Sequence, residues 1–168
     1  MSRWTSESLA DTHVIESFDP GKPELDVWLK QSAAHAAGMR TARTFVWHGG
    51  DNAVVAYFSL AAHLVTRNTL PRKIARGSPD AIPAILLAKL ALDRTLQGQG
   101  LGGELLWDAL SRAVAASDIA AARVVVVDAI DEDAARFYGH YGFVAVPRNT
   151  CRLVQKTSDI AAALAASR

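Results

Sequence analysis

The chain has little of several features that mark other protein classes. It contains a single cysteine, Cys151, so no disulfide can form within it, which is typical of proteins from a reducing cytoplasm. Long uncharged apolar runs are absent and the mean hydropathy is +0.10, so we expect no membrane association. The first residues, MSRWTSESLADTH, carry acids and no apolar core, and therefore do not resemble a signal peptide. The five histidines show no metal-ligand spacing with one another or with Cys151, and we predict no metal site.

What is present indicates one α/β domain. At 168 residues, 50% of them hydrophobic, the chain is long enough for a single substantial core. Apolar patterning predicts alternating strands and helices, which is typical of a sheet flanked by helices. The elements predicted outside the two motifs below are a strand at Thr12–Phe18, a helix at Pro23–Ala37, strands at Thr44–His48 and Ala53–Val65, a loop or short helix at Arg67–Asp80, and a last strand at Cys151–Thr157. We expect the domain to span residues 1–157, followed at 158–168 by an Ala-rich tail that is a short helix or disordered.

The most informative segment is a glycine-rich loop past the middle of the chain. The apolar run Ile85–Leu92 is followed by the polar residues DRTLQ, and glycines at positions 98, 100, 102 and 103 then lead into a helix. Leucines and alanines recur along that helix at spacings of three to five, which gives it one apolar face. Backbone N–H groups in such a loop point in one direction, at the positive end of the helix dipole. The segment therefore predicts a phosphate-binding site.

Two nucleotide-binding patterns compete for this loop. Gly98, Gly100 and Gly103 match the dinucleotide pattern G-x-G-x-x-G, and Asp128 ends the next apolar run as a ribose-binding acid would. However, five residues separate Leu92 from Gly98, whereas the dinucleotide pattern follows its strand directly. A P-loop is excluded because no Gly-Lys-Ser/Thr sequence follows. A turn that serves only close helix packing is the structural alternative.

The second pattern is Q/R-x-x-G-x-G/A, which Gln97–Gly102 matches. This match resembles the acetyl-CoA pyrophosphate loop of the GNAT superfamily of N-acetyltransferases. A second block supports the resemblance, with a buried strand at Val124–Val127, a helix, and a further strand from Phe143. Its string F-Y-x-x-x-G-F, which begins at Phe137, resembles the second cofactor-contacting helix of that family. Two motifs in this order, over roughly residues 82–146, identify the chain as a member of the superfamily.

The resemblance implies a fold, a donor and a set of site residues. The implied fold is a mixed, mostly antiparallel sheet with splayed central strands flanked by helices, and the implied acetyl donor is acetyl-CoA. Tyr138 is implied as the general acid that protonates the departing CoA thiolate, with simple core packing as the alternative. Backbone N–H groups of the splayed strand are expected to stabilise the thioester oxygen. The implied cofactor-binding residues are Leu90, Ala91, Leu92, Gln97, Gly98, Gln99, Gly100, Leu101, Gly102, Gly103, Asp131 and Phe137.

No histidine or glutamate occupies a motif position that would identify a general base. Glu16, Asp93 and His63 remain without an assigned role, and a structural role is the expectation for each. An α-amino group titrates near pH 8, whereas a lysine side chain titrates at about 10.4 and needs a base far more. The missing base therefore favours an α-amine as the acetyl acceptor.

Upstream segments narrow the resemblance further. PELDVWLKQSA, TARTFVWHG and NAVVAYFSLAAHLV, together with the glycine-loop region, are similar to bacterial GNAT toxins of toxin–antitoxin modules, over roughly residues 12–156. Those enzymes acetylate the free amino group of aminoacyl-tRNA and so halt translation. The resemblance implies aminoacyl-tRNA as acceptor and a ribbon-helix-helix antitoxin as partner, and it allows a homodimer. An acetyltransferase for a small amine or a protein N-terminus, and a non-catalytic acetyl-CoA-binding domain, are the alternatives.

Charge is unevenly distributed although the formal net charge is only +1. Between Asp26 and Asp80 the sole acid is Asp51, whereas seven basic residues occur in that interval. A basic face of this kind attracts a polyanion, and an ordinary solvated surface is the alternative. The RNA contacts that we predict lie in the loop before Asp80, at Arg67, Arg72, Lys73 and Arg76.

Overall fold

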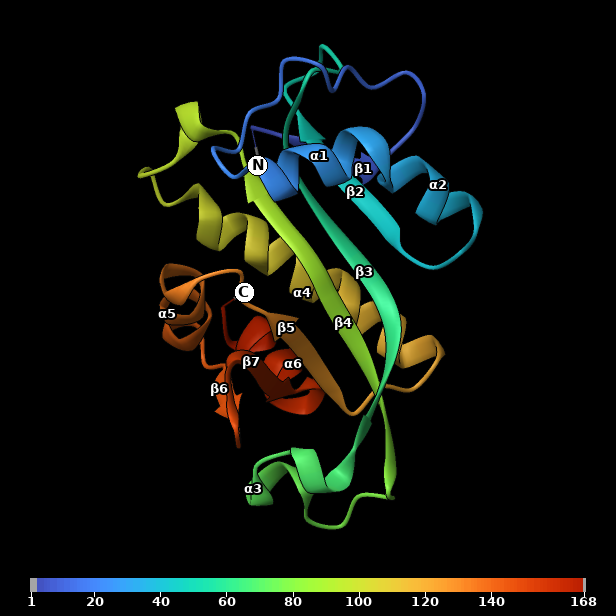
Figure 1. The fold of residues 1–168 in the computed structure, drawn as a ribbon, viewed down its shortest axis with the longest axis vertical. Coiled ribbons are helices and arrows are strands. Elements are labelled where there is room, and N and C mark those ends of the chain that lie inside the picture. Colours follow the sequence, from blue (N-terminus) through green and yellow to red (C-terminus); the bar gives the residue numbers. More distant parts are fainter. Residues whose placement is uncertain (1–2, 168) are drawn as a thin grey trace. The chain divides into compact units, whose positions relative to one another are not determined.

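The computed structural model describes residues 3–167 as one mixed sheet flanked by helices (Figure 1). The strands are β1 (Thr5–Ser8), β2 (Arg43–His48), β3 (Val54–Thr66), β4 (Ala81–Leu92), β5 (Val124–Asp128), β6 (Val144–Val146) and β7 (Asn149–Lys156). The helices are α1 (Pro23–Gln31), α2 (Ala33–Gly38), α3 (Arg72–Ala75), α4 (Leu101–Ile119), α5 (Glu132–His140) and α6 (Thr157–Ala166), with 3₁₀ turns η1 (Arg67–Thr69) and η2 (Arg94–Leu96). The seven strands lie in the order β1-β2-β3-β4-β5-β7-β6, which confirms the predicted α/β class.

Strand pairing is mostly antiparallel, as the family resemblance implied. The pairs β1–β2, β2–β3, β5–β7 and β6–β7 are antiparallel, whereas β4 and β5 are parallel. The parallel pair covers only Ala84–Leu87 against Val124–Val127, although β4 continues to Leu92. Within the described part of the chain, the last residues of β4 therefore have no partner on β5, which is the expected splay.

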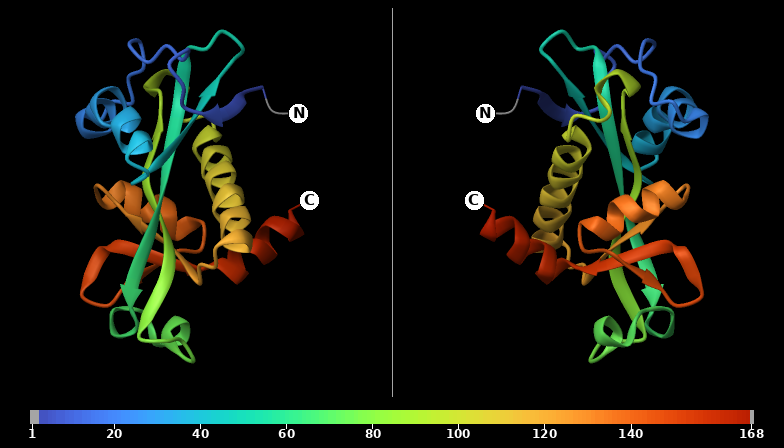
Figure 2. Two further views of the ribbon diagram at one scale, coloured as in Figure 1. Left: turned by 90° about the vertical axis from the view of Figure 1, so that its right-hand side faces the viewer. Right: turned by 90° about the vertical axis from the view of Figure 1, so that its left-hand side faces the viewer.

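The chain divides into two compact units. The first contains the residues up to Ala61 and the segment Ala88–Ala109, and the second contains Ala62–Leu87 and everything from Leu110 onward. Figure 2 shows β3 and β4 as long strands, and each of them contributes residues to both units. Among the residues described, none of the helices combines the length and the apolar character that a membrane span requires.

The core of the first unit forms between α1 and the sheet. Pro23 stands at the start of α1, where its missing N–H costs nothing, and Leu25 and Leu29 bury one face of the helix. These side chains pack with Phe18 and Tyr57, which are 1% and 0% exposed. The Tyr57 hydroxyl donates to the Leu25 carbonyl at 2.5 Å, so the buried phenol is satisfied and fixes α1 against β3.

The core of the second unit is built on β5. All four valines of β5 are fully buried, which agrees with the continuous apolar run of a strand covered on both faces. Val124 and Val126 pack with Ile82 of β4 and Val154 of β7. The Ala-rich tail is helical as far as Ala166, because α6 follows β7 directly and buries Ile160 at 1% exposure.

Two predicted elements are wrong in part. Thr12–Phe18 is not a strand: backbone hydrogen bonds close turns at Ala10–His13 and Ile15–Phe18, and a single parallel bridge joins Val14 to Ala53. The first strand, β1, lies upstream in a polar stretch that carries no alternating apolar pattern. The helix predicted at Pro23–Ala37 is two helices, because Ser32 adopts φ −122° between α1 and α2.

Candidate functional site

The glycine-rich loop has the backbone geometry that a phosphate cradle requires. It lies between η2 and α4, which begins at Leu101. Gly98 and Gly100 both have φ +81°, in the left-handed region that residues with a side chain rarely adopt. No atom lies within 4 Å of a Cβ built at either position, so the space above the loop is open. Since the first N–H groups of a helix have no intrahelical acceptor, the loop can present several donors to an anion.

The end of β4 supplies the second part of the predicted cofactor site. Leu90, Ala91 and Leu92 lie beyond the last residue that pairs with β5. Ala91 and Leu92 are buried, whereas Leu90 is only partly so. At these residues the edge of β4 toward β5 can bind other hydrogen-bonding partners, such as a pantetheine amide or a thioester oxygen. These residues and the predicted loop residues Gln97–Gly103 all belong to the first unit.

Tyr138 belongs to the second unit and lies on α5. Asp131 caps this helix by accepting a hydrogen bond from the Ala134 N–H at 2.8 Å, which is a structural role for a residue predicted at the cofactor site. Tyr138 is 7% exposed and packs edge-on against Phe137 and Phe143, at ring-centroid distances of 5.4 and 5.9 Å. Burial raises the pKa of the Tyr138 phenol, so the hydroxyl stays protonated at neutral pH.

The turn after α5 explains the glycine of the F-Y-x-x-x-G-F string. Gly142 has φ +96°, and a Cβ at this position would lie 2.9 Å from the Gln155 side-chain nitrogen. Its N–H donates to the Gly139 carbonyl, and the Phe143 N–H donates to the Tyr138 carbonyl at 3.2 Å. This tight turn fixes Phe143 against the Tyr138 ring, so the motif holds the tyrosine in one position.

The four predicted RNA-binding residues differ in their surroundings. Arg67 closes the base of its loop, donating to the Ser78 carbonyl at 3.1 Å and pairing with Asp80 at 2.8 Å. Arg72, Lys73 and Arg76 are exposed on α3 and just after it, while Ile74 is buried beneath them. The backbone of this helix is fixed from below, because the Arg123 guanidinium donates to the Ile74 carbonyl at 3.3 and 3.4 Å.

A cavity of about 760 Å³ lies beside this loop, in the second unit. The residues that line it are Leu64, Val65, Thr66, Asn68, Thr69, Asp128, Val146, Pro147, Arg148, Asn149 and Arg152. Two cations, several amide and hydroxyl groups and an apolar wall are thus brought together from β3, η1, β5, β6, β7 and the turn between β6 and β7. The sequence does not show that Arg148 and Arg152 are neighbours of Asn68 and Thr69, since only the fold brings these segments together.

Asp128, His63 and Arg152 form a charged cluster at this cavity. The Asp128 carboxylate accepts from Arg152 Nε at 2.7 Å and Nη2 at 2.8 Å, while Arg152 Nη1 lies 3.4 Å from His63 Nε2. Burial and then the positive charge of Arg152 lower the pKa of His63, against the opposing effect of Asp128. His63 is therefore neutral at pH 7.

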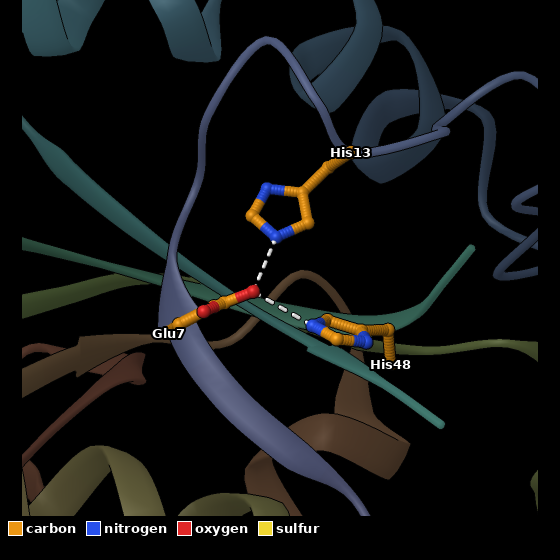
Figure 3. A group of neighbouring side chains, drawn as sticks. All are labelled: Glu7, His13 and His48. Atoms are coloured by element: carbon orange, nitrogen blue, oxygen red, sulfur yellow. Dashed lines mark hydrogen bonds and ion pairs between the residues drawn. The ribbon is translucent and has the colours of Figure 1, made fainter. Parts of the chain in front are cut away.

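A second cluster brings together two histidines that lie far apart in the sequence. Glu7 Oε1 lies 2.9 Å from His13 Nε2 and 2.7 Å from His48 Nε2 (Figure 3). Each ring also accepts a backbone N–H at Nδ1, from Ala10 at 2.9 Å and from Gly50 at 3.0 Å. Both neutral rings must therefore carry their proton on Nε2 and donate it to Glu7.

The position of the ring protons decides whether the cluster suits a metal ion or a set of hydrogen bonds. Three potential ligand atoms lie within 4.8 Å of one another, a grouping that the spacing in the sequence does not show. A cation bound by both Nε2 atoms would move each ring proton to Nδ1, where it would face a backbone N–H. The donor set thus fits a hydrogen-bonded clamp that joins β1, β2 and the His13 turn better than it fits a metal site.

Comparison with known proteins relates this geometry to an enzyme family. The acetyltransferase (GNAT) domain family matches residues 79–153, which include the glycine loop and the Tyr138 motif. A protein of Mycobacterium tuberculosis (strain ATCC 25618 / H37Rv) named tRNA-acetylating toxin is 36% identical over 151 residues, which is 90% of this chain and 90% of the relative.

Solved structures of the toxin AtaT are also similar to this chain. The structure of AtaT complexed with acetyl-methionyl-tRNAfMet is 27% identical, with a TM-score of 0.87 over 95% of this chain and 98% of that one. A tyrosine-to-phenylalanine mutant of the AtaT toxin, bound to the C-terminus of the antitoxin AtaR and acetyl-CoA, is 26% identical. It superposes with a TM-score of 0.82 over 96% of this chain and 98% of that chain.

Proposed function

Since the chain belongs to the GNAT family of acetyltransferases, and uses acetyl-CoA as the acetyl donor, we propose that it acetylates the free α-amino group of an aminoacyl-tRNA. The observation that carries this proposal is the 36% identity over 90% of both chains to a tRNA-acetylating toxin. An aminoacyl-tRNA whose amino group is acetylated cannot serve as an ordinary elongation substrate, so the protein would act as a translation-blocking toxin. Because charged tRNA is a cytoplasmic molecule, we place the reaction in the cytoplasm.

Acetyl-CoA would be held by backbone groups more than by side chains. The open cradle at Gly98–Leu101 suits a pyrophosphate, because left-handed glycines and a helix start point N–H groups toward one anion. The end of β4, from Leu90 to Leu92, suits the pantetheine amides and the thioester oxygen. These strand donors are fixed before the reaction, so they stabilise the developing negative charge without rearrangement.

Tyr138 is the residue that we assign as general acid. The amine nitrogen forms a bond to the thioester carbon, the C–S bond breaks, and the thiolate takes the proton from the Tyr138 hydroxyl. The proton that the new amide nitrogen loses returns to the phenolate through water. Burial keeps the phenol protonated before the step, so its proton is available to the departing thiolate.

Recognition of the RNA is the role that we assign to the loop Arg67–Asp80 and the cavity beside it. Arg72 and Lys73 on α3, and Arg76 just after it, are exposed, which suits contacts to phosphates. The cavity combines Arg148, amide groups and an apolar wall, the chemistry that an unpaired nucleotide requires. Arg67 is assigned to holding the loop, because its guanidinium is engaged by Ser78 and Asp80.

The partners in this proposal are an antitoxin of the ribbon-helix-helix type and a second copy of the chain. The antitoxin-bound AtaT structure supports an antitoxin as partner, and the ribbon-helix-helix type is what the resemblance to the GNAT toxins implies. β6 supports the second, because it lies at the edge of the sheet and exposes Val144 at 48%. Light scattering of the purified protein, with and without a candidate antitoxin, measures both stoichiometries.

One experiment tests the central proposal. Purified protein is incubated with labelled acetyl-CoA and with total tRNA that is either charged or deacylated. We expect label to enter only charged tRNA, and to leave it when the aminoacyl ester is hydrolysed at alkaline pH. Incorporation into free polyamines, amino acids or a peptide N-terminus, with none into charged tRNA, would contradict the proposal.

A further inference from the structure

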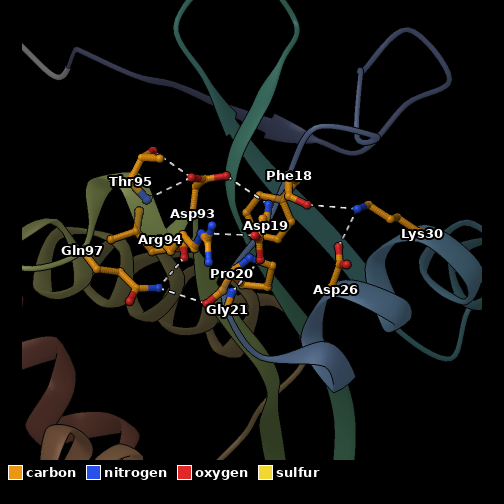
Figure 4. Close-up of polar contacts among 11 residues, drawn as sticks. Phe18, Asp19, Pro20, Gly21, Asp26, Lys30, Asp93, Arg94, Thr95 and Gln97 are labelled. Carbon is orange, nitrogen blue, oxygen red and sulfur yellow. Dashed lines mark hydrogen bonds and ion pairs between the residues drawn. The ribbon is translucent and has the colours of Figure 1, made fainter.

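The turn that precedes the glycine cradle is tied to a distant segment of the chain. We propose that Asp93 and Gln97 are positioning residues, which hold the acetyl-CoA loop in its binding shape by bracing it against residues 18–21. The proposal rests on the function above, in which that loop binds the pyrophosphate of acetyl-CoA. Figure 4 shows the hydrogen bonds that carry it, all of them within the first unit.

Gln97 is turned toward the protein backbone. Its Nε2 donates to the Leu92 carbonyl at 2.9 Å and to the Pro20 carbonyl at 3.1 Å. A side-chain amide has two N–H donors, so both are used. The Gln97 side chain thus ties the residue immediately before Gly98 to the end of β4 and to residues 18–21, which we call the brace segment. The side chain of the first residue of the Q-x-x-G-x-G motif therefore acts on loop shape rather than as a ligand.

Asp93 provides a second, independent tie. Its Oδ1 accepts from the Thr95 N–H at 3.1 Å and the Thr95 hydroxyl at 2.7 Å, which caps η2. Its Oδ2 accepts from the Asp19 N–H at 3.0 Å, and its own N–H donates to the Val55 carbonyl at 2.8 Å. Burial works to raise the pKa of Asp93, but the hydrogen bonds from Asp19 and Thr95, and then the positive charge of Arg94, outweigh it and hold the pKa below its usual range. The carboxylate is ionised at neutral pH and accepts the hydrogen bonds from Asp19 and Thr95.

Asp19 and Arg94 complete the brace through their backbones. The Arg94 N–H donates to the Asp19 carbonyl at 2.9 Å. The two side chains also form an ion pair at 3.2 Å. The Arg94 side chain is 67% exposed and the Asp19 side chain 53%, so this ion pair contributes little in water. Arg94 is therefore the control: it lies in the same turn, its side chain is mostly exposed, and its charge is the smallest of the effects that lower the pKa of Asp93.

The brace segment is itself anchored in the core. Phe18 is 1% exposed, and its carbonyl accepts a hydrogen bond from Lys30 Nζ of α1 at 2.9 Å. Lys30 also pairs with Asp26 at 2.7 Å, which fixes the ammonium group on the helix. The path from α1 through residues 18–21 to the turn at 93–97 is thus continuous. A cradle that is ordered before the ligand arrives binds it more tightly than one that must be ordered by it.

The test compares variants of Gln97 with Arg94→Ala. Gln97→Glu keeps the size of the side chain but replaces the amide NH2 group, which supplies both donors, with a carboxylate oxygen that faces two carbonyls. We expect the Kd for acetyl-CoA, measured by calorimetry, to rise about tenfold or more, with a similar rise in KM and kcat changed less than threefold. Amide hydrogen exchange at residues 98–101 of the ligand-free protein should become faster. Arg94→Ala should change each value less than twofold.

Two further variants keep the test decisive. Gln97→Arg, which restores N–H donors, should recover most of the affinity that Gln97→Glu loses. Asp93→Asn should raise the Kd and the exchange rates in the same direction, and it replaces Gln97→Glu if that variant fails to fold. Folded Gln97→Glu and Asp93→Asn proteins with unchanged Kd and unchanged exchange would overturn the proposal. A wild-type protein that does not bind acetyl-CoA would instead overturn the proposed function.

Discussion

The Asp128 carboxylate and the Arg152 guanidinium form a two-point contact across the β5–β7 pair, with N–O distances of 2.7 and 2.8 Å. Asp128 ends the apolar run that, in a dinucleotide-binding protein, would place an acid on a ribose. Here both carboxylate oxygens are engaged by Arg152, which agrees with the acetyl-CoA pattern of the glycine loop. The contact also holds the Arg152 guanidinium at the cavity wall. There the charges of Arg152 and Asp128 act in opposite directions on the pKa of His63.

We expect Arg152→Ala to raise the pKa of His63. The positive charge of Arg152 lowers this pKa, while Asp128 raises it, so removal of the arginine leaves only the carboxylate beside the imidazole. Titration of the His63 ring by NMR measures the change. Arg152→Lys is the control, because it keeps the charge and should leave the pKa below 6.5, the ordinary value. An unchanged or lower pKa in Arg152→Ala would show that burial alone governs His63.

This shift has a defined effect on stability. The pKa of His63 is lower in the folded protein than its ordinary value of 6.5, so protonation favours the unfolded chain. The contribution of neutral His63 is therefore complete above about pH 6.5 and is lost as the pH falls through the folded-state pKa. Arg152→Ala should weaken this pH dependence of the free energy of unfolding, which urea titrations at several pH values measure.

Gly100→Asp should abolish acetyl-CoA binding. Gly100 has φ +81° and open space at its Cβ, so the new carboxylate would occupy the cradle and repel the pyrophosphate. Gly100→Asn is the matched control, because asparagine tolerates a left-handed backbone and adds similar bulk without charge. Calorimetry should show measurable but weakened binding for Gly100→Asn and none for Gly100→Asp. Equal affinities for both variants and the wild type would place the pyrophosphate elsewhere.

Tyr138→Phe should lower turnover by about 10²-fold while the Kd for acetyl-CoA stays nearly unchanged. Only the hydroxyl is removed, so the aromatic packing against Phe137 and Phe143 remains and the thiolate loses its proton donor. Steady-state kinetics and calorimetry give the two values. Tyr141→Phe, three residues along on the same motif, is the control and should retain turnover. If Tyr138→Phe were fully active, water or Tyr141 would have to supply the proton.

Joint replacement of Arg72, Lys73 and Arg76 by alanine should weaken tRNA binding and flatten its salt dependence. Each lost phosphate contact lowers the slope of log affinity against log salt by about one unit. These side chains are exposed, so acetyl-CoA affinity and the melting temperature should change little. Arg43→Ala, an exposed arginine of β2, is the control for loss of charge. A salt slope that the triple variant leaves unchanged would move the RNA site away from α3.

Acid should weaken the Glu7 clamp, the pair of hydrogen bonds that Glu7 accepts from His13 and His48. Hydrogen bonds from His13 and then His48 hold the pKa of Glu7 below its ordinary value of 4.5, so the ionised carboxylate favours the folded state. That contribution is present above about pH 4.5 and is lost as the pH falls through the lowered pKa. Thermal melts from pH 3 to pH 7 should show a steeper acid decline for the wild type than for Glu7→Gln. Added zinc should leave the wild-type melting temperature unchanged, and a clear increase would favour a metal site.

Local sequence determined the parts of the fold whose chemistry is contained within a short segment. The glycines of the cradle, the capped helix at Asp131 and the turn at Gly142 each follow from a backbone requirement that only a few residue types meet. The buried strand at Val124–Asp128 follows from its continuous apolar run. For the same reason the two motifs identified the acetyltransferase family before any tertiary contact was known.

The tertiary structure decided everything that depends on residues distant in sequence. β1 is a polar edge strand, stabilised by its pairing with β2 and not by an apolar pattern of its own, so periodicity placed the strand too late. Gln97 was predicted at the cofactor because of its motif, yet its contact with Pro20 exists only once residues 18–21 lie against the turn. The Glu7 clamp likewise joins residues up to 41 positions apart. Hydrogen bonds and ion pairs of this kind depend on distances in space, which spacing along the chain does not fix.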